Sequence, residues 1–157
     1  MTEEAMFGAG CFWGVEELFR TTPGVTETAV GYAGGQKDQP TYQDVCYTDS
    51  GHAEVVHMTF NPEEVTYEQL LNLFFKNHNP TSRDRQGPDY GSQYRSVIFY
   101  YNDAQKQAAE KAIAELEATN RYINPIVTQV VEAPTFWRAE EYHQKYLAKK
   151  GLRSCHL

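Results

Sequence analysis

The sequence has few cysteines and no long apolar segment, and each shortage excludes a class of protein. Three cysteines in 157 residues cannot supply the disulfide framework of a small secreted domain, and no two of them form a Cys-x-x-Cys pair. An odd number of well-separated thiols favours a reducing compartment. No apolar run approaches the length that crosses a membrane, and the N-terminus lacks the basic and then apolar pattern of a signal peptide. We therefore expect a cytoplasmic protein without a membrane partner.

Positive charge is also scarce. The 14 Lys and Arg residues are outnumbered by 21 Asp and Glu residues, which gives a formal net charge of -7. A protein that binds nucleic acid without sequence preference needs a basic surface, so we expect no nucleic-acid partner. The five histidines show no His-Glu-x-x-His spacing, and Gly-Ala-Gly at residues 8–10 lacks the lysine of a phosphate-binding loop. We predict no bound metal, nucleotide or flavin, so electrons for a redox reaction would come from an external donor.

Length and patterning predict one folded domain over residues 1–157, with a monomer as the default. Aromatic residues make up 13% and charged residues 22% of the chain, which is typical of a folded globule. Alternating or apolar runs predict strands over residues 5–9, 25–32, 53–60, 96–101 and 126–132. Helical periodicity and capping residues, Thr66 with Gln69 among them, predict helices over residues 13–20, 67–77, 103–118 and 139–150. This order favours a two-layer α/β sandwich, followed by a short tail at residues 152–157.

Residues 8–14, Gly-Ala-Gly-Cys-Phe-Trp-Gly, contain the most informative feature of the chain, a cysteine bracketed by glycines. Cys11 follows a predicted strand and precedes a predicted helix, so its sulfur is expected at a helix N-terminus. Unpaired backbone N–H groups and the positive end of the helix dipole favour a thiolate there. The glycines let a substrate approach the sulfur, while Phe12 and Trp13 offer an aromatic wall for a small apolar group. The alternative is an unreactive cysteine packed by two core aromatics, but the glycine bracket favours a reactive thiol.

Five further segments accompany Gly-Cys-Phe-Trp-Gly, in a fixed order and over nearly the whole chain. They are Gly-Tyr-Ala-Gly-Gly at 31–35, Gly-His-Ala-Glu at 51–54, Asp-Arg-Gln-Gly at 84–87, Gln-Tyr-Arg-Ser at 93–96 and Glu-Glu-Tyr-His-Gln at 140–144. Together the six segments resemble the type A peptide methionine sulfoxide reductases. The resemblance implies a ferredoxin-like βαββαβ core with additional helices and a C-terminal coil. It also implies reduction of methionine S-sulfoxide, protein-bound or free, in the repair of proteins under oxidative stress.

Reduction of a sulfoxide needs a nucleophile for the sulfur, a proton for the departing oxygen and a pocket for the methyl group. Cys11 is the predicted nucleophile, and its attack would leave a sulfenic acid and release methionine. Glu54 is the predicted acid because it begins a strand on the same face as three apolar side chains, where partial desolvation would raise its pKa. Position alone favours a surface carboxylate at a strand end, and the resemblance at residues 51–54 reverses that preference.

The resemblance implies further site residues. The Tyr42 and Tyr94 hydroxyls would join the glutamate in binding the sulfoxide oxygen, a role that suits phenols because they donate hydrogen bonds without carrying charge. Phe12 and Trp13 would hold the methyl group, and Asp89 would orient the substrate. Any one of the 11 tyrosines is more often a packing residue, and Asp89 fits an Asx-type turn at least equally well.

Cys155 is the predicted resolving thiol. A tail cysteine can reach a sulfenic acid at Cys11, form a disulfide and expel water, although an inert terminal cysteine is the alternative. Many members of the family carry two tail cysteines, whereas this chain has one. An external dithiol, thioredoxin by the resemblance, would then reduce the Cys11–Cys155 disulfide directly. Cys46 is expected to be a bystander, with a backup resolving role as the alternative.

Two other functions fit parts of the sequence. A cysteine acyl transferase or hydrolase could pair Cys11 with His52 or His143, and it would form an acyl-enzyme without needing Cys155. A non-catalytic peptide-binding module lined with aromatic residues would function without Cys11. Neither function uses an acid, a reactive thiol and a tail thiol in one chain, so we favour the reductase.

Overall fold

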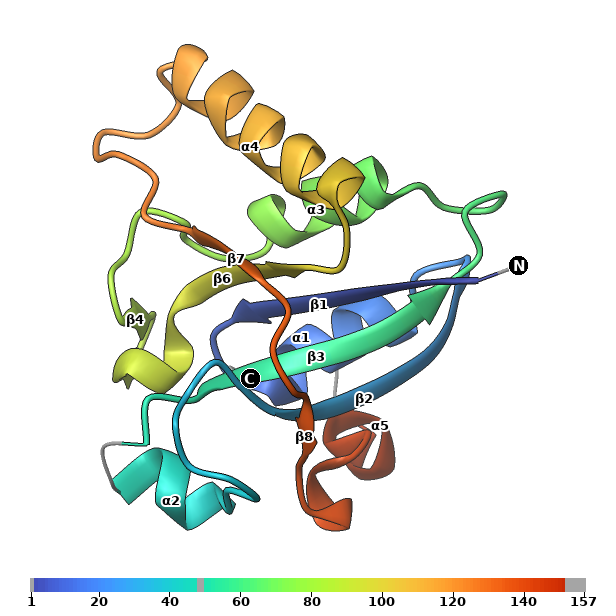
Figure 1. The fold of residues 1–157 in the computed structure, drawn as a ribbon, viewed down its shortest axis with the longest axis vertical. Coiled ribbons are helices and arrows are strands. Elements are labelled where there is room, and N and C mark those ends of the chain that lie inside the picture. Colours follow the sequence, from blue (N-terminus) through green and yellow to red (C-terminus); the bar gives the residue numbers. More distant parts are fainter. Residues whose placement is uncertain (1, 48–49, 152–157) are drawn as a thin grey trace.

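The computed structural model describes residues 2–47 and 50–151 and contains a six-stranded sheet with helices packed against it (Figure 1). The strands of this sheet are β1 (Glu3–Ala9), β2 (Val25–Ala33), β3 (Ala53–Phe60), β6 (Ser96–Tyr100), β7 (Gln129–Glu132) and β8 (Trp137–Arg138). A separate small hairpin consists of β4 (Arg85–Gln86) and β5 (Asp89–Tyr90). The helices are α1 (Phe12–Arg20), α2 (Tyr42–Tyr47), α3 (Tyr67–Lys76), α4 (Asp103–Ala118) and α5 (Tyr146–Lys150), with single 3₁₀ turns η1 (Ser92–Tyr94) and η2 (Glu141–His143).

The sheet has the strand order of a ferredoxin-like fold. Its strands follow the order β7-β6-β1-β3-β2-β8, and the four central strands β6, β1, β3 and β2 are antiparallel to one another. Helix α1 connects β1 to β2, and α3 lies between β3 and β6 in the chain, which completes a βαββαβ core. At the edges, β7 is parallel to β6, and β8 is antiparallel to β2. The predicted α/β sandwich is therefore confirmed.

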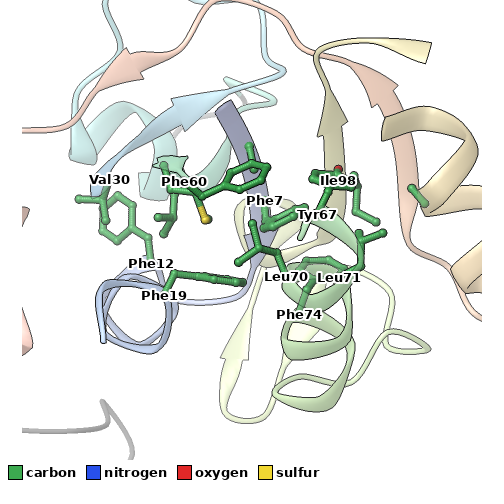
Figure 2. Close-up of a cluster of buried hydrophobic side chains, with 14 of the residues drawn as sticks. Phe7, Phe12, Phe19, Val30, Phe60, Tyr67, Leu70, Leu71, Phe74 and Ile98 are labelled. Atoms are coloured by element: carbon green, nitrogen blue, oxygen red, sulfur yellow. The ribbon is translucent and has the colours of Figure 1, made fainter. Parts of the chain in front are cut away.

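The main hydrophobic core lies between this sheet and helices α1 and α3 (Figure 2). Phe7 of β1 is its centre, with ring centroids 5.5 Å from Phe19 of α1 and 5.1 Å from Phe74 of α3. Alternate residues of β3 point to one face, and its Val56, Met58 and Phe60 belong to this core. The same alternation turns Glu54, the charged member of the row, toward α1.

The long predicted helices form for the local reasons that the sequence offers. Helix α3 begins with the predicted capping box, in which Thr66 Oγ1 accepts from the Gln69 backbone N–H at 3.1 Å and Gln69 Oε1 accepts from the Thr66 N–H at 2.9 Å. Asn102 caps α4 by accepting from the Gln105 N–H at 2.9 Å. These caps satisfy N–H groups that a helix leaves unpaired at its start.

The helix predicted over residues 139–150 is wrong. The segment consists of the turn η2 and the short helix α5, separated at Lys145, whose φ of 52° is left-handed. The Gln144 side chain stabilises the broken conformation, because its amide pairs with both the N–H and the C=O of Val30 in β2, at 2.8 and 2.9 Å. The Lys145 N–H then donates to the buried Glu16 carboxylate at 2.6 Å. Contacts to distant segments therefore outweigh local helical propensity here.

Several short elements were not predicted, and one strand is shorter than expected. Helix α2 and strand β8 lie in segments with no readable periodicity, and the hairpin β4–β5 and the turn η1 lie between residues 78 and 95, for which no helix or strand was predicted. The strand predicted over 126–132 begins only at Gln129. Elements of two to six residues carry too few side chains to show a period, so tertiary contacts decide them.

Half-buried His78 makes the stability of the fold sensitive to pH. Burial lowers its pKa from 6.5 to about 4, against a hydrogen bond to the Phe74 carbonyl, and its Nε2 lies 2.7 Å from the Ser96 hydroxyl. Between these pH values the unfolded chain binds a proton that the folded protein does not. The free energy of unfolding should therefore fall by about 2 kcal/mol from pH 7.5 to pH 5.

Urea unfolding of the wild type and His78→Gln at both pH values checks this prediction. The glutamine amide can donate to the Phe74 carbonyl and accept from Ser96, but it does not titrate. We expect the variant to lose the difference that His78 contributes. An equal pH dependence in both proteins would contradict the prediction.

Candidate active site

Cys11 lies at the junction of β1 and α1. β1 ends at Ala9, Gly10 turns the chain with a φ of 102°, and Cys11 is the N-cap of α1, its carbonyl accepting from the Val15 N–H at 3.4 Å. Gly10 is needed for this turn because a left-handed φ is costly for other residues, and a Cβ atom there would lie 3.0 Å from Gln86 Cβ. The predicted cysteine at a helix N-terminus is thus confirmed.

Glu54 lies directly beneath this helix end. Its side chain is 2% exposed, and its Oε1 accepts a hydrogen bond from the Phe12 backbone N–H at 3.1 Å. Phe12 follows Cys11 in the chain, so the carboxyl of β3 and the sulfur of Cys11 occupy neighbouring positions. The partial positive charge of the helix end offsets part of the cost of burying this carboxyl. Glu54 is therefore a buried group beside the thiol and not a surface carboxylate.

Tyr42 and Tyr94 come from α2 and η1 and are half-buried around Glu54. Burial raises the pKa of Tyr94 far above its usual value, and Glu54 raises it further whenever its carboxyl is ionised. Burial is also the largest cause of the raised pKa of Tyr42, and its interaction with Cys46 is the next largest. Both hydroxyls consequently keep their protons at neutral pH and can act as hydrogen-bond donors in this site.

Cys46, which was expected to be a bystander, lies inside this group. Tyr42, Tyr94 and Gln93 lie near its thiol, and so does Glu54. Burial raises the pKa of Cys46, although polar interactions with the two tyrosines and Gln93 oppose that shift. A raised pKa keeps this sulfur a thiol and makes it a weaker nucleophile at neutral pH.

An aromatic wall lies beside the helix end. Trp13 stacks on Tyr146 of α5, with ring centroids 3.8 Å apart and planes at 8°, and its Nε1 donates to His143 Nδ1 at 3.0 Å. The ring of Phe12 is 1% exposed and lies 5.1 Å from the His143 ring, so it supports the wall from the core side. Tyr42 lies 4.8 Å from the same histidine ring and joins the wall to the tyrosine pair.

A hollow of about 740 Å³ opens onto Cys11 from the opposite side, between α1 and α3. Its lining includes Val15, Leu18, Phe74 and Gln86, but not Glu54 or the two tyrosines. Cys11 therefore borders this hollow and also adjoins Phe12, whose N–H contacts Glu54.

Comparison with known proteins identifies the family. The family model of peptide methionine sulfoxide reductase matches residues 3–157. The chain belongs to this family. A type A relative, peptide methionine sulfoxide reductase MsrA of Acidobacterium capsulatum, is 59% identical over 154 residues, which make up 98% of this chain and 99% of that protein. The chain is accordingly an oxidoreductase that acts on methionine sulfoxide.

Solved structures agree with this assignment. Reduced Mxr1 of Saccharomyces cerevisiae is 37% identical, with a TM-score of 0.87 over 96% of the reductase and 86% of Mxr1. A methionine sulfoxide reductase A of Corynebacterium diphtheriae is 36% identical, with a TM-score of 0.86 over 98% and 77% of the two chains. Mxr1 of Saccharomyces cerevisiae has also been solved in complex with Trx2. The alignment with that structure has 25% sequence identity and a TM-score of 0.63, and it covers 92% of the reductase and 84% of that chain.

The structure brings most of the predicted site residues together. Cys11, Glu54, Tyr42 and Tyr94 surround one point, and Asp89 of β5 is close enough for its charge to raise the pKa of Tyr94, after larger effects of burial and other charges. Trp13 and Phe12 form adjoining parts of the aromatic wall. The predicted resolving residue Cys155 lies outside the described residues.

His143, Tyr146 and Cys46 were missed as parts of the reductase site. The signal for His143 was its position in the matching segment at residues 140–144, which an assumed continuous helix concealed. His143 also argues against an acyl-transfer role, because its Nδ1 accepts from Trp13. His52 is likewise engaged, with Nδ1 accepting from the Gly35 N–H at 3.0 Å and Nε2 2.6 Å from the Lys37 carbonyl.

Within residues 2–47 and 50–151, no three His, Cys, Asp or Glu side chains cluster in a way that could hold a metal ion. None of the helices in those ranges has the length and apolar character needed to cross a membrane.

Proposed function

We propose that the reductase acts on the S epimer of methionine sulfoxide, free or in a protein, through a sulfenic acid on Cys11. The Cys11 thiolate attacks the sulfoxide sulfur while the oxygen takes a proton from Glu54. The oxygen then passes to Cys11, so the substrate sulfur gains the two electrons that Cys11 loses and methionine leaves. The observation that carries this proposal is the bond from the Phe12 N–H to Glu54 Oε1, which sets a buried carboxyl beside the helix end that bears Cys11.

In this scheme Glu54 donates the proton from its neutral form, which burial favours over the carboxylate. Its side chain is buried among groups that keep their own protons, and burial penalises a carboxylate relative to a carboxylic acid. The Phe12 N–H stabilises the anion once the proton has left. A positioned general acid accelerates such a step by about 10² to 10⁴-fold.

Tyr42 and Tyr94 hold the sulfoxide oxygen in this scheme. Their protonated hydroxyls donate to an oxygen that becomes more negative as the Cys11 sulfur attacks, and both tyrosines are half-buried there. Trp13 and Phe12 receive the methyl group, and Asp89 orients the rest of the substrate near Tyr94. A single methyl group contributes only about 1 kcal/mol by burial, so this pocket orients more than it binds.

Cys155 resolves the sulfenic acid in the second half of the reaction. Its sulfur attacks the sulfenic sulfur of Cys11, forms a disulfide and releases water. A thioredoxin then reduces this disulfide, a step supported by the complex of the related Mxr1 with Trx2. One chain of residues 1–157 carries every group that the scheme needs, so a monomer suffices, and a thioredoxin donor fits a reducing cytoplasm and the repair of oxidised proteins.

A single-turnover assay without reductant tests the proposal. The reduced enzyme is mixed with each epimer of a methyl sulfoxide, and methionine and remaining thiols are counted. We expect one methionine per chain and the loss of two thiols, with the S epimer alone. Cys155→Ser should still form one methionine, but its turnover with thioredoxin should fall at least about a hundredfold, because no disulfide is presented to the donor.

The same variants separate the rival functions. Ester or thioester hydrolysis that is unchanged in Cys155→Ser, with no methionine formed, would favour an acyl transferase. Methionine formation without loss of the second thiol in the wild type would remove Cys155 from the scheme.

A further inference from the structure

We propose that Glu140 is a positioning residue for Tyr42, acting through the backbone at the start of α2. The inference rests on the proposed function of Tyr42 as a donor to the sulfoxide oxygen. Glu140 lies immediately before the turn η2, and its only distinction in the sequence is membership of a matching segment.

Glu140 bridges two site elements with its two carboxylate oxygens. Oε2 accepts from the backbone N–H of Tyr42 at 3.0 Å, across 98 residues of sequence. Oε1 accepts from the hydroxyl of Tyr32 in β2 at 3.0 Å. The carboxylate thus ties α2, which carries Tyr42 and Cys46, to the central sheet.

Helix α2 needs such an anchor. It has six residues, which is too short to be stable through its own hydrogen bonds. Thr41 and Asp44 cap each other's backbone at its start, with the Thr41 N–H donating to Asp44 at 2.9 Å and the Asp44 N–H donating to Thr41 Oγ1 at 3.2 Å. This exchange leaves the Tyr42 N–H to be satisfied from elsewhere, and Glu140 satisfies it.

The backbone that carries Glu140 is itself held in place on both sides. The Ala139 N–H donates to the Val30 carbonyl at 2.9 Å, and the Gln144 side chain pairs with the N–H and C=O of the same residue. Glu140 also closes η2, since its carbonyl accepts from the His143 N–H at 3.0 Å. The position of Tyr42 is therefore fixed relative to β2 through Glu140 and the backbone that carries it.

Charge strengthens the bridge. Burial by itself would raise the pKa of Glu140, but the hydrogen bonds from Tyr42 and Tyr32 outweigh burial and lower the pKa on balance. Glu140 is consequently an anion at neutral pH, and hydrogen bonds to an ionised acceptor are about twice as strong as neutral ones. An amide in its place would keep the shape of the bridge and lose this charge.

The test measures the rate of methionine formation in single turnovers, with substrate saturating. Glu140→Ala removes both acceptors, and we expect the rate to fall about tenfold as the Tyr42 hydroxyl loses its position, compared with about a hundredfold for Tyr42→Phe, which removes an oxyanion donor outright. Glu140→Gln should recover most of the rate, because its amide oxygen can still accept from Tyr42. Tyr32→Phe is the matched control, since it removes the other partner and should change the rate by less than about threefold.

A double-mutant cycle distinguishes positioning from general damage. In a Tyr42→Phe background, Glu140→Ala should slow the reaction by less than about twofold, because the hydroxyl it positions is gone. An unreduced tenfold loss in that background would overturn the inference and indicate a structural role only. A wild-type rate of methionine formation in Glu140→Ala would overturn the inference as well. Failure of the wild type to form methionine would instead overturn the proposed function, before any variant is compared.

Discussion

Cys11→Ser should form no methionine in a single turnover. A serine hydroxyl at neutral pH is a far weaker nucleophile than a thiolate. It also cannot take the oxygen from a sulfoxide, because the product would be a hydroperoxide and not a sulfenic acid. We expect the rate to fall below detection, a loss of at least about 10⁴-fold, while the far-ultraviolet circular dichroism spectrum stays that of the wild type. The helix would still begin at Phe12, because Gly10 and the Phe12 contact to Glu54 are unchanged.

Cys46→Ser provides the matched control for this prediction. Both sulfurs are partly buried within the same site, so a non-specific requirement for a thiol would affect both variants alike. Cys46→Ser should still yield one methionine per chain, because the serine hydroxyl can replace the thiol in polar contacts with Tyr42 and Tyr94. If Cys11→Ser formed methionine and Cys46→Ser formed none, the nucleophile would be Cys46, and our assignment of Cys11 would be wrong.

Glu54→Gln should slow the sulfoxide step by about 10² to 10⁴-fold without unfolding the protein. The amide cannot deliver a proton to the departing oxygen. Its carbonyl oxygen can still accept from the Phe12 N–H, so the contact that fixes the helix end survives. Rapid-quench measurement of methionine over time gives the rate, and urea unfolding gives the stability.

Glu16→Gln tests whether any buried carboxylate matters to the same degree. Glu16 is 1% exposed on α1, where it accepts from Thr28 at 2.7 Å and from the Lys145 N–H, on the side of the helix facing α5. Its replacement should cost about 1 to 3 kcal/mol of stability and change the sulfoxide step by less than about threefold. A normal rate in Glu54→Gln, or an equal loss of rate in both variants, would contradict the assignment of Glu54 as the acid.

The core of the fold could be predicted from the periodicity and capping residues of the sequence. The alternation in β3 predicts that Glu54 shares a face with the core residues, and the stripe of α3 and its capping box predict where that helix begins. Cys11 at a helix N-terminus follows from Gly10 between a strand and a helical period. These features are local, so a window of about ten residues contains their causes.

The parts that escaped prediction depend on contacts between distant residues. The helix break at Lys145 is stabilised by two contacts, from Gln144 to Val30 in β2 and from the Lys145 N–H to Glu16 in α1. Both partners lie more than 100 residues earlier in the chain. The aromatic wall needs Trp13 and Tyr146 to meet, and no periodicity reports such a meeting. Tyr42, Tyr94 and Asp89 were identified through the family resemblance, since their own surroundings in the sequence distinguish them little from other residues.

The two outermost strands of the sheet are also its shortest, and this matters for an enzyme whose substrates include oxidised proteins. Damaged chains expose unpaired strands, which add readily to a long open sheet edge and aggregate there. β7 has four residues and β8 has two, so each edge offers few backbone groups to an incoming strand. Next to β8, the N–H and C=O of Val30 are already occupied by the Gln144 amide. We expect the reductase to release partly unfolded clients after reduction instead of joining them in a shared sheet.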